Sequence, residues 1–433
     1  MTVRTSRRMI LQGAALAALA GPLAACSTTS GSSASSTQAS AASGEITFSY
    51  LWSGPESDAL QTIVRNFNSS QSNIKVTGVS SPDFQKQLTA MSASKGSFDV
   101  SDNFGNGVGS WASKGILAQL DDLYAKAGGN LSSFVPSTLG QMKYQGKIYS
   151  LPIASHTFQL LYNKKLLADA GVKPPTTITE FADAIKKLTK LTPSGDIQVL
   201  GLGNPDMGTT LTTLGYCFGG SWDDSNGPTP DQPQNVAAVQ WWQDNIISAY
   251  GADKYAKFKA GWGQYMSAQD PFYTGQVAMV IDGEWQAVNI PKVAPNLQWG
   301  VTAIPVPDPS LAGTTQVTTS TLFIPQNSQN KEAAAAFLKY MTGSEAMGAF
   351  TKALGNLPTR TDLLSSNTYA DIPNFSMWLD SLKSDKVKAL SSAPFASQYV
   401  QDLASAFDSV AGGKSTAADA LAKVATAAKS YAG

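Results

Sequence analysis

The strongest constraint on the fold is a repeated order of strand-like and helix-like segments that begins at Glu45. Short runs rich in β-branched and aromatic residues predict strands, and longer runs with apolar residues every three or four positions predict amphipathic helices. In the first part of the chain these runs alternate as strand 45–52, helix 57–68, strand 74–79, helix 84–94 and strand 98–100. Because parallel strands are joined by crossover connections, usually helices, this order predicts an α/β body with a mainly parallel sheet.

The rest of the chain continues this order less regularly. Residues 179–191 predict an amphipathic helix, with Thr177 or Thr179 as its N-cap and the Pro-Ser-Gly sequence at 193–195 after its end. We also expect strands at 148–153, 277–282 and 300–304, and helices at 162–170, 237–250 and 331–341.

The first 25 residues have the features of an export signal. Three arginines at positions 4, 7 and 8 form a basic start, and the apolar run 9–20 is about 12 residues long, which is too short to span a membrane. The sequence Leu-Ala-Ala-Cys at 23–26 resembles a bacterial lipobox, in which the cysteine is lipidated before cleavage. We therefore predict a signal peptide at 1–25 and a lipidated Cys26. An ordinary signal peptide with an incidental cysteine stays open, as does the choice between Sec and twin-arginine export.

Residues 26–43 are predicted to form a lipid-anchored, flexible linker. From Ser27 to Ser43 the chain holds only Ser, Thr, Ala, Gly and one Gln, so it has too little apolar surface to offset the entropy lost on ordering. No second hydrophobic run reaches membrane-spanning length. We therefore expect an extracytoplasmic protein, tethered by Cys26 to the outer face of the cell membrane.

The mature chain is slightly acidic and has no cysteine pair. Loss of three arginines from 31 basic groups would leave 28 against 31 acidic groups, a net charge of −3, so no basic face for nucleic acid is implied. With Cys26 lipidated, Cys217 has no partner for an intramolecular disulfide. The remaining body of roughly 390 residues exceeds the size at which single cores divide, and we expect two lobes.

Several segments, taken in order, resemble the carbohydrate-specific solute-binding proteins of ABC importers, the maltose-binding-protein type. They extend over nearly the whole body from about Glu45. The segments are 144–153, 161–171, Thr177 with Glu180-Phe181, 273–285, 300–305, 323–325, 330–338 and 357–360.

This resemblance implies a periplasmic-binding-protein-like α/β fold of two discontinuous lobes around a ligand cleft. The chain would cross between lobes near Ala154, Thr302 and Gly355, so that 44–154 and 303–355 form lobe 1, and 155–302 and 356–433 form lobe 2. The resemblance further implies a sugar or oligosaccharide ligand, captured by hinge closure. It implies delivery to the transmembrane subunits of an ABC permease, and a monomer that is not an enzyme and needs no cofactor.

Sugar sites combine aromatic platforms for the apolar ring faces with carboxylates, amides and hydroxyls for the polar edges. In the resembling family the aromatic residue at the position of Trp285 stacks on a sugar ring, and Asp282 and Glu284 shortly precede it. Trp52 and Glu56 follow the first predicted strand. Because strand ends line the clefts of open α/β sheets, both are candidate ligand contacts.

Other candidates come from the predicted crossings and from the Gly-rich segment after residue 100. His156, the only histidine, lies two residues beyond the first crossing, where the family often places a polar ligand contact. Asn103, Phe104 and Asn106 belong to either a simple turn or a cleft-lining loop, without a phosphate-binding pattern. The family often carries Gly-Gly where this chain has Thr319 and Ser320, which could replace a backbone approach by hydroxyl contacts. The remaining candidates are Trp222, Asn356, Arg360 and Tyr399, then Tyr216, Trp262 and Tyr265, whereas Trp241-Trp242 is expected to pack.

Three other functions stay open at this point. A glycoside hydrolase needs two carboxylates about 5–9 Å apart, and carboxylates are plentiful, but the chain has no nucleophile elbow, HExxH motif or Cys–His pair. A single histidine disfavours a transition-metal site, and we predict no metal. A polyamine, phosphate or iron complex could occupy the same fold. Anionic ligands usually meet arginines or helix N-termini, whereas the cleft candidates are mainly aromatic and neutral, so a sugar is favoured.

Overall fold

The computed structural model describes residues 42–431. The predicted signal peptide, Cys26 and nearly all of the predicted linker lie outside these residues. From Ala42 onward the chain forms one compact unit. In the part that the structure describes, no helix combines the length and the apolar character needed to cross a membrane.

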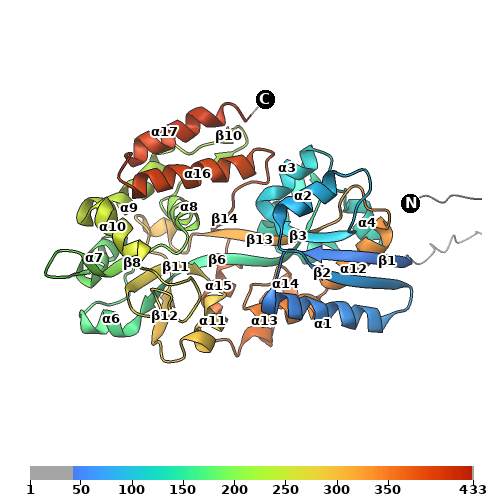
Figure 1. Ribbon diagram of the computed structural model, residues 1–433, viewed down its shortest axis with the longest axis horizontal. Coiled ribbons are helices and arrows are strands. Elements are labelled where there is room, and N and C mark those ends of the chain that lie inside the picture. Colours follow the sequence, from blue (N-terminus) through green and yellow to red (C-terminus); the bar gives the residue numbers. More distant parts are fainter. Residues whose placement is uncertain (1–41, 432–433) are drawn as a thin grey trace, which may run out of the picture. The chain divides into compact units, whose positions relative to one another are not determined.

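A ten-stranded sheet runs through this unit, in the order β2-β1-β3-β13-β6-β11-β8-β7, with β12 beside β6 and β14 beside β13 (Figure 1). Two short hairpins lie outside the sheet, β4 (Lys143–Tyr144) with β5 (Lys147–Ile148) and β9 (Asp223–Asp224) with β10 (Gly227–Pro228). The strands of the sheet are β1 (Gly44–Tyr50), β2 (Ile74–Ser80), β3 (Val100–Phe104), β6 (Leu151–Asn163), β7 (Lys190–Leu191), β8 (Ile197–Gly203), β11 (Val277–Gly283), β12 (Trp299–Thr302), β13 (Thr315–Phe323) and β14 (Val387–Lys388).

The sheet is mixed, so the prediction of a mainly parallel sheet was wrong. β1 pairs in parallel with β2 and β3, and β11 pairs in parallel with β8. Between these two groups, β6 and β13 run antiparallel to each other, β13 runs antiparallel to β3, and β6 runs antiparallel to β11. The strand–helix alternation therefore holds within each group, and two long antiparallel strands join the groups.

The chain around residues 151–169 shows how strand pairing overrides local sequence preference. The sequence predicted a strand that ends at residue 153 and a helix at 162–170. Instead, β6 continues to Asn163 because Tyr162 and Asn163 pair with Gly300 and Trp299 of β12. Helix α6 (Lys164–Asp169) follows directly, and the Asn163 side chain accepts a hydrogen bond of 3.1 Å from the backbone N–H of Leu166 as its N-cap.

Helices cover both groups of strands. In Figure 1, α1, α12 and α13 lie beside β1 and β2, and α8, α9, α16 and α17 lie together near the C-terminus. The helices are α1 (Gly54–Ser70), α2 (Phe84–Ser92), α3 (Val108–Ser113), α4 (Asp121–Lys126), α5 (Pro136–Gly140), α6, α7 (Ile178–Leu188), α8 (Met207–Cys217), α9 (Pro233–Trp242), α10 (Ala252–Ala260), α11 (Gln286–Val293), α12 (Lys331–Met341), α13 (Ser344–Leu354), α14 (Thr361–Leu364), α15 (Ser376–Ser381), α16 (Ala396–Ala411) and α17 (Ala417–Ala428).

Local capping signals fixed some helix ends as the sequence predicted. Thr177 caps α7, and its side chain and that of Glu180 form a capping box with each other's backbone N–H groups. Helix α12 has the predicted bounds. The predicted helix at 237–250 begins earlier, at Pro233, and continues beyond Trp242 as a π-helical segment, Gln243–Ser248.

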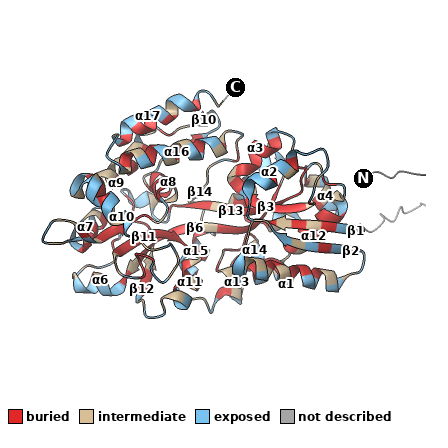
Figure 2. Ribbon diagram, in the orientation of Figure 1, coloured by how far each residue is buried: buried red, intermediate tan, exposed pale blue. Residues whose placement is uncertain are grey.

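The core follows the sheet. Most strand residues are buried, whereas the outer faces of helices such as α6 and α7 are exposed (Figure 2). Strands β6, β11 and β13 are buried on both faces, as their continuous apolar and small-polar sequences require.

Candidate ligand site

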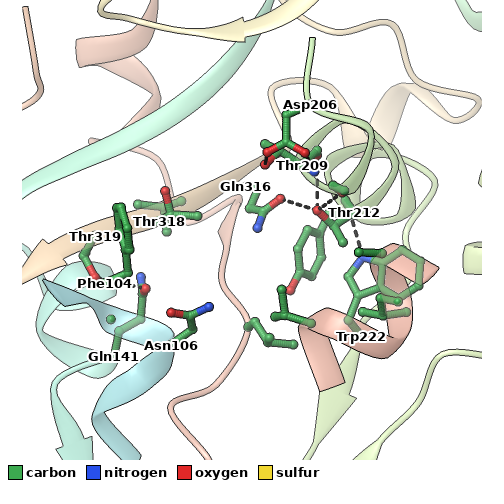
Figure 3. Close-up of a pocket in the computed structure, with 18 of the residues that line it drawn as sticks. Phe104, Asn106, Gln141, Asp206, Thr209, Thr212, Trp222, Gln316, Thr318 and Thr319 are labelled. Atoms are coloured by element: carbon green, nitrogen blue, oxygen red, sulfur yellow. Dashed lines mark hydrogen bonds between the residues drawn. The ribbon is translucent and has the colours of Figure 1, made fainter. Parts of the chain in front are cut away.

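A cavity of about 400 Å³, here called the first cavity, is lined by chain segments that lie far apart in the sequence. One wall comes from the end of β3, the 3-10 turn that follows it and the end of α5. The opposite wall comes from α8, the turn before β9, and α16. Figure 3 shows Phe104, Asn106 and Gln141 on one side, and Asp206, Thr209, Thr212 and Trp222 on the other. Residues 316–319 of β13 complete the lining.

Two buried polar groups on opposite walls of the first cavity have no hydrogen-bond partner among the described residues. They are the Nε2 amide of Gln141 and the hydroxyl of Tyr216. The other amide atom of Gln141, Oε1, accepts a hydrogen bond of 3.1 Å from Thr319 Oγ1. Because buried polar groups are nearly always paired, these two groups indicate where a ligand oxygen would bind.

Part of the remaining polar lining is held in place by protein contacts. Gln316 Oε1 accepts hydrogen bonds of 2.8 Å from Thr212 Oγ1 and 3.1 Å from Thr213 Oγ1 (Figure 3). Asp206 caps α8, where its carboxylate accepts hydrogen bonds from the backbone N–H and the hydroxyl of Thr209. Burial raises the pKa of Tyr216 above its ordinary range, with Asp223 adding to the effect. Tyr216 therefore stays protonated and can donate a hydrogen bond.

The two aromatic candidates in this cavity differ in exposure. Phe104 is 58% exposed, whereas Trp222 is fully buried. Trp222 Nε1 donates to the carbonyl of Thr212 at 2.8 Å, and Tyr399 donates to the carbonyl of Trp222 at 2.6 Å. Phe104 is thus the available stacking surface, while Trp222, supported by Tyr399, forms part of a wall.

Asn103, Phe104 and Asn106 lie at the junction of β3 and the turn that follows it. Asn103 and Phe104 end β3, so they belong to the strand and not to a loop. The Asn103 amide is buried, accepts a hydrogen bond from the Phe104 backbone N–H at 2.6 Å and donates to Gln87 Oε1 at 3.0 Å. It therefore supports Phe104, whereas Phe104 and Asn106 line the cavity.

A second group of predicted residues forms one hydrogen-bonded network. His156 Nδ1 lies 2.7 Å from Glu284 Oε1, and His156 Nε2 lies 3.1 Å from Ser320 Oγ. Glu284 is fully buried and its other carboxylate oxygen accepts from the Thr157 backbone N–H at 3.3 Å. Burial raises the pKa of Glu284 above its ordinary range, although His156 and the hydrogen bonds act in the opposite direction. This network joins β6, β13 and the end of β11.

Trp285 and Asp282 are linked through Tyr265. Trp285 Nε1 donates to the Tyr265 hydroxyl at 2.7 Å, and that hydroxyl donates to Asp282 Oδ1 at 2.8 Å. The Trp285 ring also meets the His156 ring edge-on, with 5.5 Å between centroids. Burial raises the pKa of Asp282 to about 7, although hydrogen bonds from Gln286, the Gly283 backbone and Tyr265 lower it.

None of the remaining predicted residues lines the first cavity. Trp52 packs edge-on against Phe350, with 5.3 Å between ring centroids. Glu56 is half-buried in the first turn of α1. Asn356 follows α13, and the Arg360 guanidinium is engaged by Asp362, with Nε 2.9 Å from Oδ1 and Nη2 3.1 Å from Oδ2.

Sequence reasoning missed six polar residues of the first cavity, namely Gln141, Asp206, Thr209, Thr212, Gln316 and Thr318. Asp206 carried a usable signal, because it follows the buried strand β8 and precedes a helix, the position where α/β sheets place ligand contacts. Gln141 and Gln316 have no local signal. Among the described residues, no group of three or more His, Cys, Asp or Glu could hold a metal ion.

Comparison with known proteins gives this architecture a family. Residues 53–348 match the model of the family described as bacterial extracellular solute-binding protein, so the chain belongs to that family. Members of this family are binding proteins, and their name places them outside the cytoplasm.

Individual relatives and solved structures agree with this assignment. A putative binding protein of Brucella abortus is 29% identical over 260 residues, which cover 57% of this chain and 60% of that protein. The chain thus spans 60% of the length of the Brucella binding proteins that it matches. The protein CpMnBP1 with mannobiose bound has a TM-score of 0.78 and 28% identity, covering 89% of this chain and 99% of that one.

Two further similarities are more distant. The maltotriose-binding protein of Pyrococcus abyssi is 21% identical over 339 residues, covering 76% of this chain and 69% of that protein. The acarbose-binding GacH receptor of Streptomyces glaucescens has a TM-score of 0.74 at 24% identity, covering 90% of this chain and 98% of that one. At that identity the GacH similarity supports the fold alone, a two-lobed α/β binding-protein fold as predicted.

Proposed function

We propose that this protein captures a neutral sugar or short oligosaccharide in the first cavity and delivers it to the permease of an ABC importer. The observation that carries this proposal is the pair of unpartnered groups, Gln141 Nε2 and the Tyr216 hydroxyl, on opposite walls. Sugar hydroxyls both donate and accept hydrogen bonds, so one ligand can satisfy both groups. The exposed ring of Phe104 offers an apolar face for a sugar ring.

The charges around the first cavity favour a neutral ligand. No Lys, Arg or His lines it, and its one carboxylate, Asp206, is already engaged by Thr209. A phosphate would lack a cationic partner, and a polyamine would find a single carboxylate. The relatives solved or named with mannobiose, maltotriose and acarbose support the same ligand class.

Capture would follow from hinge closure. We propose lobes of 44–154 with 303–355, and of 155–302 with 356–433, so that Gln141 and Tyr216 belong to different lobes. A ligand that contacts both lobes favours their closed arrangement by the free energy of the added contacts. A transmembrane permease would recognise that arrangement, with the receptor acting as a monomer.

The same proposal includes the N-terminal anchor. A signal peptide at 1–25 would be removed, Cys26 would be lipidated, and residues 26–43 would tether the body to the outer face of the cell membrane. Because a single acyl chain binds membranes only marginally, stable anchoring would require the multiple chains of a bacterial lipoprotein.

A thermal-shift screen of the purified protein tests the proposed ligand class, because a ligand that binds only the native state raises the melting temperature. The panel should hold mannobiose, mannotriose and maltotriose, with inorganic phosphate and spermidine as the charged alternatives. We expect at least one neutral sugar to raise the melting temperature. A shift with phosphate or spermidine alone, or cleavage of the sugars during incubation, would contradict the proposal.

A pair of exposed phenylalanines locates the site. Phe104→Ala removes the proposed stacking surface and should weaken sugar binding about tenfold, which corresponds to 1.4 kcal/mol. Phe84→Ala is the matched control, since Phe84 is 46% exposed and lines neither this cavity nor the second one described below. Equal affinities of the two variants would contradict the placement of the ligand in the first cavity.

A further inference from the structure

A second cavity, of about 250 Å³, lies within residues 203–286 and shares no lining residue with the first. Its lining comes from the end of β8, the end of α10 and the segment after it, the turn before β11, and the adjoining parts of β11 and α11. The residues used below are Pro205, Lys259, Trp262, Tyr265, Asp270 and Asp282. Because the whole lining belongs to one continuous stretch of chain, this cavity does not depend on the first.

The hydrogen bonding of this cavity leaves one buried side-chain donor without a partner among the described residues. Asp270 accepts from the backbone N–H groups of Met266 at 2.8 Å and Phe272 at 2.9 Å. Asp282 accepts from the Tyr265 hydroxyl at 2.8 Å and from Gln286 Nε2 at 2.6 Å. Trp262 Nε1, in contrast, is buried and finds no acceptor within the part of the chain described here. The site therefore lacks an acceptor atom, which a ligand oxygen would supply.

The charges and surfaces favour a neutral ligand. Groups of both signs line the cavity, namely the carboxylates of Asp270 and Asp282 and the ammonium of Lys259, which lies 5.8 Å from the ring centroid of Trp262. Both carboxylates already accept hydrogen bonds from protein groups. Aromatic and proline surfaces from Trp262, Tyr265 and Pro205 make up much of the wall. Such surfaces suit the C–H face of a neutral ring that carries polar edge groups.

We propose that the second cavity binds one neutral sugar ring, separately from the ligand of the first cavity, with a ring or hydroxyl oxygen accepting from Trp262 Nε1. This site goes beyond the transport ligand proposed above. It also adjoins that ligand's site, because Pro205 lines the second cavity and the next residue, Asp206, lines the first and caps α8.

Indole N–H resonances of the purified protein test the proposal directly. The Trp262 resonance is identified by its loss in Trp262→Phe, and D-mannose, D-glucose and D-galactose are then titrated one at a time into the unmutated protein. We expect one of them to shift the Trp262 resonance in a saturable way, and to do so equally in Tyr216→Phe, which alters the first cavity. If none of the three shifts it at tens of millimolar, the proposal is wrong.

Variants and stoichiometry separate this site from the transport site. Trp262→Phe should weaken monosaccharide binding about tenfold, or 1.4 kcal/mol, whereas Trp241→Phe, outside both cavities, should leave it unchanged. In calorimetry, mannobiose at the first cavity and the monosaccharide should bind together, one molecule of each. If mannobiose and the monosaccharide compete for one site, and Trp262→Phe weakens mannobiose binding as strongly as Tyr216→Phe does, the proposal of a separate site is wrong. The thermal-shift screen tests the transport ligand independently of either result.

Discussion

The two cavities differ in how their walls are built and in how far their polar groups are satisfied. The first takes its walls from segments more than 250 residues apart, and leaves two buried polar groups, Gln141 Nε2 and the Tyr216 hydroxyl, unpaired on opposite sides. The second takes its lining from 203–286 alone, and its one buried side-chain donor without a partner among the described residues is Trp262 Nε1. Unpaired groups on walls from distant segments suit a ligand that draws two lobes together, whereas a lining that is almost fully paired suits a preformed site.

The largest expected effect concerns a buried aspartate in each group of strands. Asp102 in β3 and Asp282 in β11 both have a pKa raised by burial from 3.8 to about 7. Between those values the native state binds more protons than the unfolded state, so the free energy of unfolding falls as the pH rises from about 4 to about 7. At about 1.4 kcal/mol per unit of pKa shift, the loss is on the order of 4 kcal/mol for each group.

Urea unfolding between pH 4 and pH 8 measures this dependence. Asp102→Asn and Asp282→Asn should each reduce the loss of stability over this pH range by about the contribution of one aspartate. The double variant should reduce it by the sum of the two contributions. Only Asp282→Asn should also change monosaccharide binding at the second cavity. If Asp102→Asn changes that binding equally, the second cavity is not the independent site inferred from its lining.

The next largest effect concerns Gly105, which lines the first cavity. A Cβ atom at Gly105 would lie 2.2 Å from Thr319 Oγ1 and 2.9 Å from Gln141 Oε1, so Gly105→Ala must displace the hydrogen bond between these two side chains. We expect a stability loss of about 1–3 kcal/mol and at least tenfold weaker sugar binding, while the Trp262 resonance should respond to the monosaccharide as before.

Gly140→Ala is the matched control for this change. Gly140 directly precedes Gln141 in the chain, but a Cβ atom added at Gly140 would meet no heavy atom within 4 Å. Calorimetric titration with the best sugar from the screen should give an unchanged dissociation constant for Gly140→Ala. Unchanged binding by Gly105→Ala as well would mean that the Thr319–Gln141 contact does not shape the site.

Sequence reasoning reached the parts of these sites that local pattern controls. Phe104 and Asn106 became candidates because they follow the predicted strand 98–100, and Thr319 because it departs from the pattern of the resembling family. The pairing of His156 with Glu284 could not be foreseen, since the two residues are 128 positions apart and meet only because β6 and β11 pair. The same pairing explains why Trp285 lies against His156 and not in the first cavity.

Long-range pairing also explains the errors in the fold. Tyr162 and Asn163 carry a helix-like pattern, yet β12 holds both in β6. The sequence did not reveal that β6 and β13 form the antiparallel centre of the sheet. Both strands are buried on both faces, so they lack the alternation of apolar and polar residues that is typical of antiparallel strands with one solvated face. Which strand lies beside which is decided by contacts that no local segment encodes.

The smallest effect separates an unpaired group that binds ligand from one that does not. The hydroxyls of Tyr216 and Tyr255 are both buried without a hydrogen-bond partner among the described residues, but only Tyr216 lines the first cavity. Removing an unsatisfied buried hydroxyl should stabilise the ligand-free protein, so Tyr216→Phe and Tyr255→Phe should each raise the free energy of unfolding by about 1 kcal/mol. Tyr216→Phe alone should weaken sugar binding, by about five- to tenfold for one lost hydrogen bond. Urea unfolding without sugar and calorimetry with sugar measure the two quantities on the same samples. Equal sugar affinities of the two variants would show that the Tyr216 hydroxyl does not contact the ligand. The first cavity would then resemble the second in having one unpaired buried group that binds the ligand, Gln141 Nε2 in place of Trp262 Nε1.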